Sequence, residues 1–197
     1  MIEAIRRQLM AERDFFADMA ASLAEPTAQA AALLIAALRG GGTIYVCGNG
    51  GSAADAQHIA GELVGRFLRE RQALACVALT TNSSLLTCIG NDYSFDEVFA
   101  RQVRALARPG DVLWAISTSG SSPNILRAAE AARQRGAKVL AMTGRSGGRL
   151  KDLADIALCV PADSTPRIQQ GHLALLHLLC GLVEDNLADP KNPKGKG

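Results

Sequence analysis

The feature that most restricts the fold of this chain is a series of short apolar segments that alternate with helical patterns after residue 42. These segments are expected to form strands at 43–47, 74–79, 112–116, 138–143 and 156–160. Helical patterns lie between or after them at 52–66, 95–107, 122–135 and about 166–187. Continuous apolar strands that are separated by helices are typical of a parallel sheet covered on both faces. The sequence therefore predicts an α/β domain over residues 42–187.

The first 41 residues show no strand pattern and are predicted to form two helices. Apolar residues recur at close to helical spacing over 2–24. Pro26 interrupts this pattern, and Thr27 can cap a second helix that ends at the glycines 40–42. The second helix needs an apolar partner, which is either the sheet domain or another subunit. The tail, 188–197, is rich in Pro, Gly and Lys and is expected to be disordered.

Composition and charge argue against some classes of partner. The 197 residues carry a net charge of +2, and dense basic residues occur only at the C-terminal end. Neither nucleic acid nor a membrane surface is therefore expected as the main partner. No apolar run reaches the roughly 20 residues of a membrane span, and the charged N-terminus lacks the apolar core of a signal peptide. The five cysteines show no C-x-x-C spacing and are expected to be reduced, which indicates a cytoplasmic location.

Polar loops follow the first four predicted strands. They read CGNGGS, TTNSS, STSGSS and TGRSGG. In open parallel sheets, ligands bind beyond the carboxyl ends of the strands, so these loops are expected to line one site. Their hydroxyl groups and exposed backbone N–H groups suit a phosphorylated ligand.

The first of these loops matches the loose form of a dinucleotide-binding fingerprint, with Gly48, Gly50 and Ala53 at the required spacing. That fingerprint also requires an acidic residue at the end of the second strand, where this chain has TTN. The G-K-[ST] ending of a P-loop is absent from the sequence as well. A dinucleotide is therefore disfavoured, while a sugar-phosphate loop and a tight turn without a ligand both remain open.

The segment STSGSSPN (117–124) gives a stronger indication of an anion site. It places five hydroxyl groups between a buried strand and a helix whose first turn contains Pro123. Ser119 and Ser122 then lie near the helix N-terminus, where exposed N–H groups and the helix dipole favour an anion. The alternative is an ordinary capping loop, although capping requires only one hydroxyl.

His58 and Glu62 lie four residues apart in a predicted helix and therefore share one of its faces. This spacing can place both side chains on one metal ion, or set a carboxylate beside an imidazole for proton transfer. Arg66 continues the same stripe and could meet an anion. A surface contact without function is the alternative.

The last helix contains the segment RIQQGHLALLH, with Gln169, His172 and His177. His177 is either a hydrogen-bonded core residue or a site residue, and the helix pattern alone leaves both open. Gln169 and His177 are separated by about 12 Å of helix rise. A site that uses both therefore requires side chains that lean together, a helix that starts late, or a second subunit.

Four motifs in register resemble the sugar isomerase (SIS) family: GNGGSAADAQH, CIGND (88–92), STSGSS and RIQQGHLALLH. The resemblance extends over about residues 1–187 and is closest to the members that isomerise sedoheptulose 7-phosphate. It implies a doubly wound, mainly five-stranded parallel sheet with an N-terminal helical extension. It also implies a homotetramer with active sites between subunits and one zinc ion per subunit.

The resemblance further implies a role for each residue that matches a family motif. The substrate would be bound by Asn49, Gly50, Gly51, Ser52, Glu62, Asn91, Asp92, Ser117, Thr118, Ser119, Ser122 and Gln169. The zinc ion would be held by His58, Glu62, Gln169 and His177. Glu62 and His177 would also form the catalytic acid/base pair.

These assignments imply an enzyme that converts sedoheptulose 7-phosphate to D-glycero-D-manno-heptose 7-phosphate through an enediol(ate). Its product would feed heptose precursors of lipopolysaccharide core or a related glycan. The alternative is a non-catalytic phosphosugar-binding protein, like the relative that binds the replication initiator DnaA and lacks the glutamate and the final histidine. This chain has both Glu62 and His177, which favours the enzyme.

Overall fold

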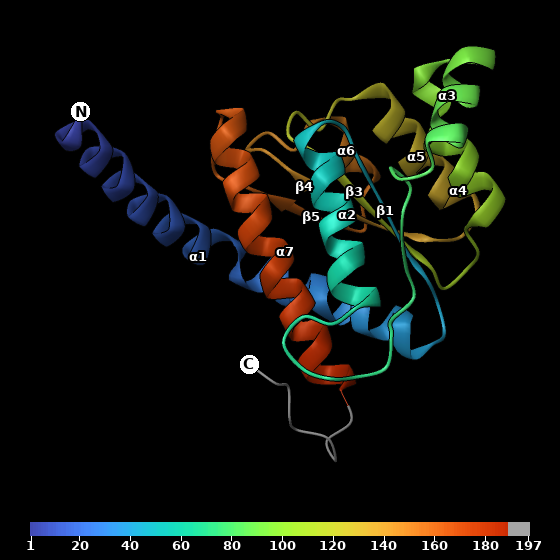
Figure 1. Cartoon of the computed structure of the whole chain (residues 1–197), viewed down its shortest axis with the longest axis horizontal. Coiled ribbons are helices and arrows are strands. Elements are labelled where there is room, and N and C mark those ends of the chain that lie inside the picture. Colours follow the sequence, from blue (N-terminus) through green and yellow to red (C-terminus); the bar gives the residue numbers. More distant parts are fainter. Residues whose placement is uncertain (189–197) are drawn as a thin grey trace.

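A five-stranded parallel sheet lies at the centre of the computed structural model, which describes residues 1–188 (Figure 1). Its strands are β1 (Ile44–Gly48), β2 (Cys76–Ala78), β3 (Val112–Ser117), β4 (Lys138–Thr143) and β5 (Ile156–Cys159). They lie in the order β2-β1-β3-β4-β5. After β2 the chain therefore crosses to the other side of β1, where β3, β4 and β5 are added in turn. This order confirms the predicted doubly wound α/β fold. Of the tail that is expected to be disordered (188–197), residues 189–197 lie outside the described part.

Helices flank the sheet on both faces. They are α1 (Ile2–Arg39), α2 (Gly51–Val64), α3 (Ser83–Asp92), α4 (Ala100–Leu106), α5 (Pro123–Gln134), α6 (Gly148–Leu153) and α7 (Thr165–Leu187), with a 3-10 helix η1 (Phe95–Glu97). The helix predicted at 95–107 is divided into η1 and α4. Neither α3 nor α6 was predicted, because each buries a single apolar residue, Ile89 or Leu150, and so shows little apolar periodicity.

Alternate residues of the central strands face two separate cores, as the two-residue period of a strand requires. On β3, Trp114 and Ile116 belong to the core that α1, α2 and α7 complete. Leu113 and Ala115 belong to the core on the other face, which includes residues of α4, α5 and α6. The helices that carry His58 and His177 therefore lie on the same face of the sheet.

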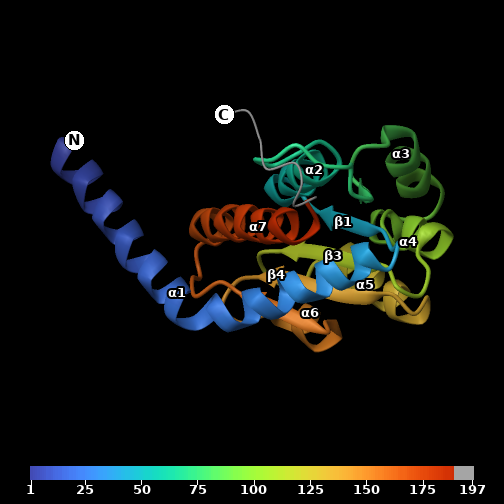
Figure 2. The same ribbon diagram turned by 90° about the horizontal axis from the view of Figure 1, so that it is seen from below.

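The predicted helix break at Pro26 is wrong, because α1 is continuous with Pro26 inside it. Proline lacks an N–H donor and its ring crowds the preceding turn, which bends a helix without necessarily ending it. Figure 2 shows that α1 changes direction part-way along its length. Thr27, predicted as a cap, is buried instead, and Ala30 and Leu34 beyond it belong to the core. Packing against the domain thus outweighs the local cost of the proline.

The N-terminal part of α1 extends beyond the rest of the domain (Figures 1 and 2). Each of the first ten residues is exposed. By length and composition α1 is apolar enough to cross a membrane, contrary to the expectation from the sequence. This is weak evidence for a span, because Ala31 and Leu34 show that part of the apolar stretch packs in the core.

His172 faces the sheet from α7 and is fully buried. Its Nε2 lies 3.1 Å from the carbonyl oxygen of Thr143, while its Nδ1 is buried without a hydrogen-bond partner. Burial lowers the pKa of His172 to about 4, and the hydrogen bond to Thr143 opposes this only in part. The imidazole is therefore neutral near pH 7 and donates its Nε2–H to the carbonyl.

We predict that His172 makes the fold sensitive to acid. The unfolded chain binds a proton at this residue with a pKa near 6.5, whereas the folded chain resists protonation until about pH 4. The free energy of unfolding should therefore fall by about 2 kcal/mol between pH 8 and pH 5 because of this residue. Urea unfolding of wild type and His172→Leu at fixed protein concentration measures the difference. Equal pH dependence in the two proteins would contradict the assignment.

Candidate active site

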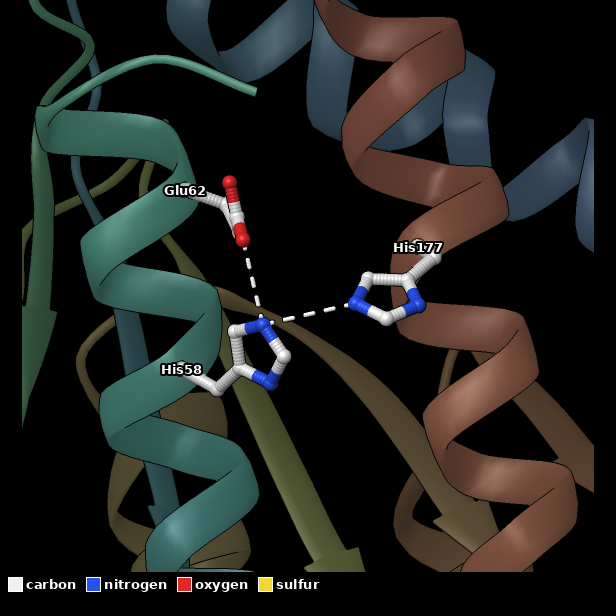
Figure 3. A group of neighbouring side chains, drawn as sticks. All are labelled: His58, Glu62 and His177. Atoms are coloured by element: carbon white, nitrogen blue, oxygen red, sulfur yellow. Dashed lines mark hydrogen bonds and ion pairs between the residues drawn. The ribbon is translucent and has the colours of Figure 1, made fainter. Parts of the chain in front are cut away.

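His58, Glu62 and His177 converge between α2 and α7 (Figure 3). The Nε2 atom of His58 lies 3.1 Å from Oε1 of Glu62 and 3.3 Å from Nε2 of His177. One candidate ligand atom from each side chain lies within 4.8 Å of the other two. The structure thus joins a predicted pair on one helix to a predicted residue on another.

The packing of the two helices explains this convergence. Ile59 and Leu63 of α2 and Leu176 of α7 are fully buried in the same core. The residues next to these three in the sequence are His58, Glu62 and His177, and they lie at the edge of the contact between the helices. They remain partly exposed, with 39% of the His58 side chain and 21% of the Glu62 side chain accessible. The site is therefore open to a ligand.

The three side chains have the chemistry and spacing of a metal site. With metal–ligand distances near 2.0–2.1 Å, the ligand atoms of a tetrahedral zinc site lie about 3.3 Å apart. Two of the observed separations, 3.1 and 3.3 Å, are close to this value. Two imidazoles and one carboxylate also form a known catalytic donor set that leaves a fourth position for a ligand. These residues can hold a divalent metal ion.

The surroundings of His177 differ from those of a core residue. Its ring meets the ring of His58 edge-on at 4.9 Å between centroids, and it stacks on Phe67 at 5.8 Å. The buried histidine of α7 is His172 instead. A cavity of about 270 Å³ opens beside His177, between α7 and α1, and includes Glu12. His177 is therefore not a core residue and lies in the candidate site.

The glycine turn after β1 contacts the start of α7. Gly50 has a φ of +55°, a conformation that favours glycine. Gly51 lies so close to the side-chain amide of Gln169 that a Cβ atom there would overlap it. The side-chain amides of Asn49 and Asn124 form two reciprocal hydrogen bonds of 2.8 and 2.9 Å. Asn124, in the first turn of α5, thereby fixes the turn, although the sequence reasoning did not select it.

The hydroxyl-rich loop after β3 folds back on itself. Ser117 Oγ lies 3.1 Å from Ser122 Oγ and 3.5 Å from Ser119 Oγ. Ser122 is the N-cap of α5, but its side chain forms no capping hydrogen bond. The hydroxyl of Ser122 is thus directed to Ser117, and the first turn of α5 lacks a side-chain cap. This arrangement favours the anion-site interpretation over ordinary capping.

Asp55 lies beside the candidate site and was not predicted from the sequence. It lines a cavity of about 330 Å³ together with Gly51, Gln169 and Leu173. Burial raises the pKa of the Asp55 carboxyl, and the nearby His58 opposes this in part. One of its oxygens is buried without a hydrogen-bond partner. Its position three residues before His58, on the same helical stripe, was the available signal.

Not all predicted site residues meet within one chain. Gln169 and His177 lie on one continuous helix, so the expected 12 Å of rise separates them. His58 likewise lies about 10 Å along α2 from Gly51 at the glycine turn. Two adjoining cavities, which share Gln170 and Leu173, line the face of α7 between these points.

The segment CIGND was predicted to supply a second substrate loop. The structure places Asn91 and Asp92 instead in the last turn of α3, where both are exposed. Figure 1 shows α3 beyond α2, on the side away from α7. A hydrogen bond of 2.9 Å joins the two side chains. A role for them in substrate binding stays a prediction.

Comparisons with known proteins agree with this architecture. A family model described as the SIS domain matches residues 10–144. A phosphoheptose isomerase of Rhodospirillum rubrum is 58% identical over 160 residues, which cover 81% of this chain and 85% of that protein. A phosphoheptose isomerase of Pelobacter propionicus is 50% identical over 187 residues, with coverage of 95% and 99%.

Solved structures agree as well. The phosphoheptose isomerase of Neisseria gonorrhoeae superposes with a TM-score of 0.88 at 46% identity, and the match covers 93% of this chain and 98% of that chain. That of Francisella tularensis superposes with a TM-score of 0.89 at 38% identity and the same coverage. The NanR protein of Vibrio vulnificus, solved with ManNAc-6P, shares the fold at 18% identity and a TM-score of 0.67, over 94% of this chain and 62% of that chain.

We predict that the purified protein binds one divalent metal ion per chain and that His177→Ala weakens this binding at least 100-fold, because one of three ligands is lost. Elemental analysis after dialysis and titration with a chelator as competitor measure the stoichiometry and the affinity. The matched control is His172→Leu, which removes a histidine from the same helix outside the triad. Equal metal content in His177→Ala and wild type would contradict the proposed ligand.

Proposed function

Since the chain belongs to the SIS-domain family, and since His58, Glu62 and His177 converge in its structure, we propose that it isomerises sedoheptulose 7-phosphate to D-glycero-D-manno-heptose 7-phosphate. The observation that carries this proposal is a carboxylate placed between two helices beside two imidazoles. The chain is also 50% or more identical to two phosphoheptose isomerases over most of its length. The product would feed the synthesis of a heptose-containing glycan such as lipopolysaccharide core.

The reaction transfers a proton between C1 and C2 of the sugar through an enediol(ate). Such a transfer requires a base near the proton and an acid for the sugar oxygens. We assign the base to Glu62, whose carboxylate is partly shielded from water, and the acid to His177 on the facing helix. The two side chains approach the site from different helices, α2 and α7.

The phosphate group is proposed to bind at the hydroxyl-rich loop. The hydroxyls of Ser117, Ser119 and Ser122 gather at the start of α5, where the helix dipole favours an anion. Thr118 is partly exposed beside them. Binding energy at the phosphate, remote from the reacting carbons, then positions C1 and C2.

We further propose that the metal ion is zinc, one per subunit, held by His58, Glu62 and His177. The donor set fits this ion, and bound zinc would act as a Lewis acid toward the oxygens of the sugar. Gln169 is proposed to bind the substrate and to serve as a fourth ligand. Because it lies two helical turns from His177 in the same chain, its role as ligand requires a contribution from another subunit.

A homotetramer with sites between subunits would supply that contribution. Ile2, Ile5, Leu9 and Phe16 form an exposed apolar stripe on the protruding part of α1. An apolar cavity of about 350 Å³ lies between α1 and α7 and includes Leu178. Exposed apolar surface of this kind indicates protein–protein contacts. A cytoplasmic location is proposed as well, since all five cysteines are free.

Glu62→Gln tests the catalytic assignment. We expect kcat to fall at least 100-fold, because the amide cannot accept the transferred proton. Proton NMR of sedoheptulose 7-phosphate with protein and zinc detects the anomeric signal of the aldose product. Stabilisation of the variant by the substrate in a thermal shift assay, together with its zinc content, separates lost chemistry from lost binding. Turnover at the wild-type rate would end the assignment, and substrate binding without turnover in wild type would favour the non-catalytic alternative.

A second test concerns assembly. The double variant Ile5→Asp/Leu9→Asp should dissociate the tetramer, because it places charges on the exposed apolar stripe. Size-exclusion chromatography with light scattering gives the mass, and Gln8→Asp on the same helix serves as the control. A wild-type protein with the mass of a single chain would show that the tetramer is wrong, and an unchanged tetramer in the variant would exclude this stripe as the interface.

A further inference from the structure

A buried ion pair joins the segment after α2 to the end of α7. Nε of Arg71 lies 3.2 Å from Oε1 of Glu184, and the two side chains are only 1% and 2% exposed. Both lie further along the chain than the nearest proposed metal ligand. Arg71 follows the end of α2, and Glu184 lies on α7 two turns after His177. Neither side chain is one of the proposed ligands.

The guanidinium group of Arg71 binds the end of α2. It donates hydrogen bonds of 2.7 Å to the carbonyl of Glu62 and 2.8 Å to the carbonyl of Leu63. A longer contact of 3.4 Å reaches the carbonyl of Gly65. Carbonyl groups in the last turn of a helix lack partners within the helix, and a cation there complements the helix dipole. Arg71 therefore fixes the backbone of the residue that carries the proposed base.

The carboxylate of Glu184 binds the loop that follows α2. It accepts three hydrogen bonds, from the backbone N–H groups of Phe67 (2.9 Å), Leu68 (2.6 Å) and Arg69 (2.8 Å). Burial alone would raise the pKa of Glu184, but these three donors and Arg71 lower it overall. The carboxylate is thus ionised and holds the loop against α7.

This loop reaches the site through Phe67. Its ring stacks on the imidazole of His177 with an angle of 29° between the planes. The ring also lies against Gly181, where a Cβ atom would stand 3.3 Å from it. The ion pair therefore acts on both sides of the triad, at the backbone of Glu62 and at the ring of His177.

We propose that Arg71 and Glu184 are positioning residues that set the separation of the metal ligands on α2 and α7. The inference rests on the proposed metal site. Stability alone does not explain the pair, because a buried ion pair often contributes little more than an apolar pair of similar volume. The ion pair links two sets of directed hydrogen bonds, from Arg71 to the end of α2 and to Glu184 from the loop after α2. Such bonds fix a relative position more strictly than apolar packing does.

The test compares metal affinity with stability in the metal-free state. The double variant Arg71→Met/Glu184→Leu replaces both charges by apolar side chains, so no unpaired charge remains buried. We expect its thermal unfolding midpoint without metal to stay close to that of wild type while its Kd for zinc rises 10- to 100-fold, the usual effect of residues that orient ligands. Titration against a chelator gives the Kd, and the visible absorption spectrum of the Co²⁺ form reports the ligand geometry. Glu184→Gln provides a second variant if the double variant does not fold.

The matched control is Asp185→Asn. Asp185 pairs with Arg69 at 3.0 Å between the same two segments, but both side chains are about half exposed. This variant should keep the wild-type Kd and Co²⁺ spectrum. Unchanged affinity in the double variant, or equal losses of affinity in Asp185→Asn, would overturn the proposal. If wild type itself bound no metal, the proposed metal site would fail and the inference would fall with it.

Discussion

The packing of α2 against α7 on one face of the sheet is the contact on which the rest of the site depends. Buried aliphatic residues of both helices, such as Leu63 and Leu179, belong to a single core with Trp114 of β3. This core brings together side chains that lie far apart along the chain. At its margin, polar groups that would each be unremarkable alone come within ligand distance of one another. The geometry of the candidate site thus depends on the apolar contact between the two helices.

Helix α7 contributes both to the apolar core and to the candidate site. His177 lies five positions after His172, a step that turns the helix by about 140°. His172 therefore points into the core, where burial keeps its imidazole neutral, while His177 faces α2. Glu184, further along, is buried but remains ionised because donors surround it. Three titratable side chains of one helix thus have three different environments.

The sequence predicted the features that depend on local patterns, and missed those that depend on distant contacts. All five strands lie within or very close to the predicted segments, and β4 coincides with its segment, because apolar runs between turns are a local signal. The break at Pro26 was wrong because packing decides whether a helix continues through a proline. Glu184 pairs with a loop 117 positions away, and no local sequence pattern predicts such a contact. A charged residue is moreover expected at the surface when only the sequence is known. The Asn49–Asn124 pair was missed for the same reason.

The two adjacent glycines of the turn after β1 are constrained by different physics. Gly50 is constrained by its own backbone, since a φ of +55° strains any residue with a side chain. Gly51 has no such φ and is constrained by a neighbour, the amide of Gln169 on α7. A side chain at position 51 would therefore require the amide of Gln169 to move aside, whereas no movement of a neighbour relieves the backbone conformation at position 50. Two adjacent glycines thus differ in what a substitution would disturb: the position of a neighbouring side chain at 51, and the backbone itself at 50.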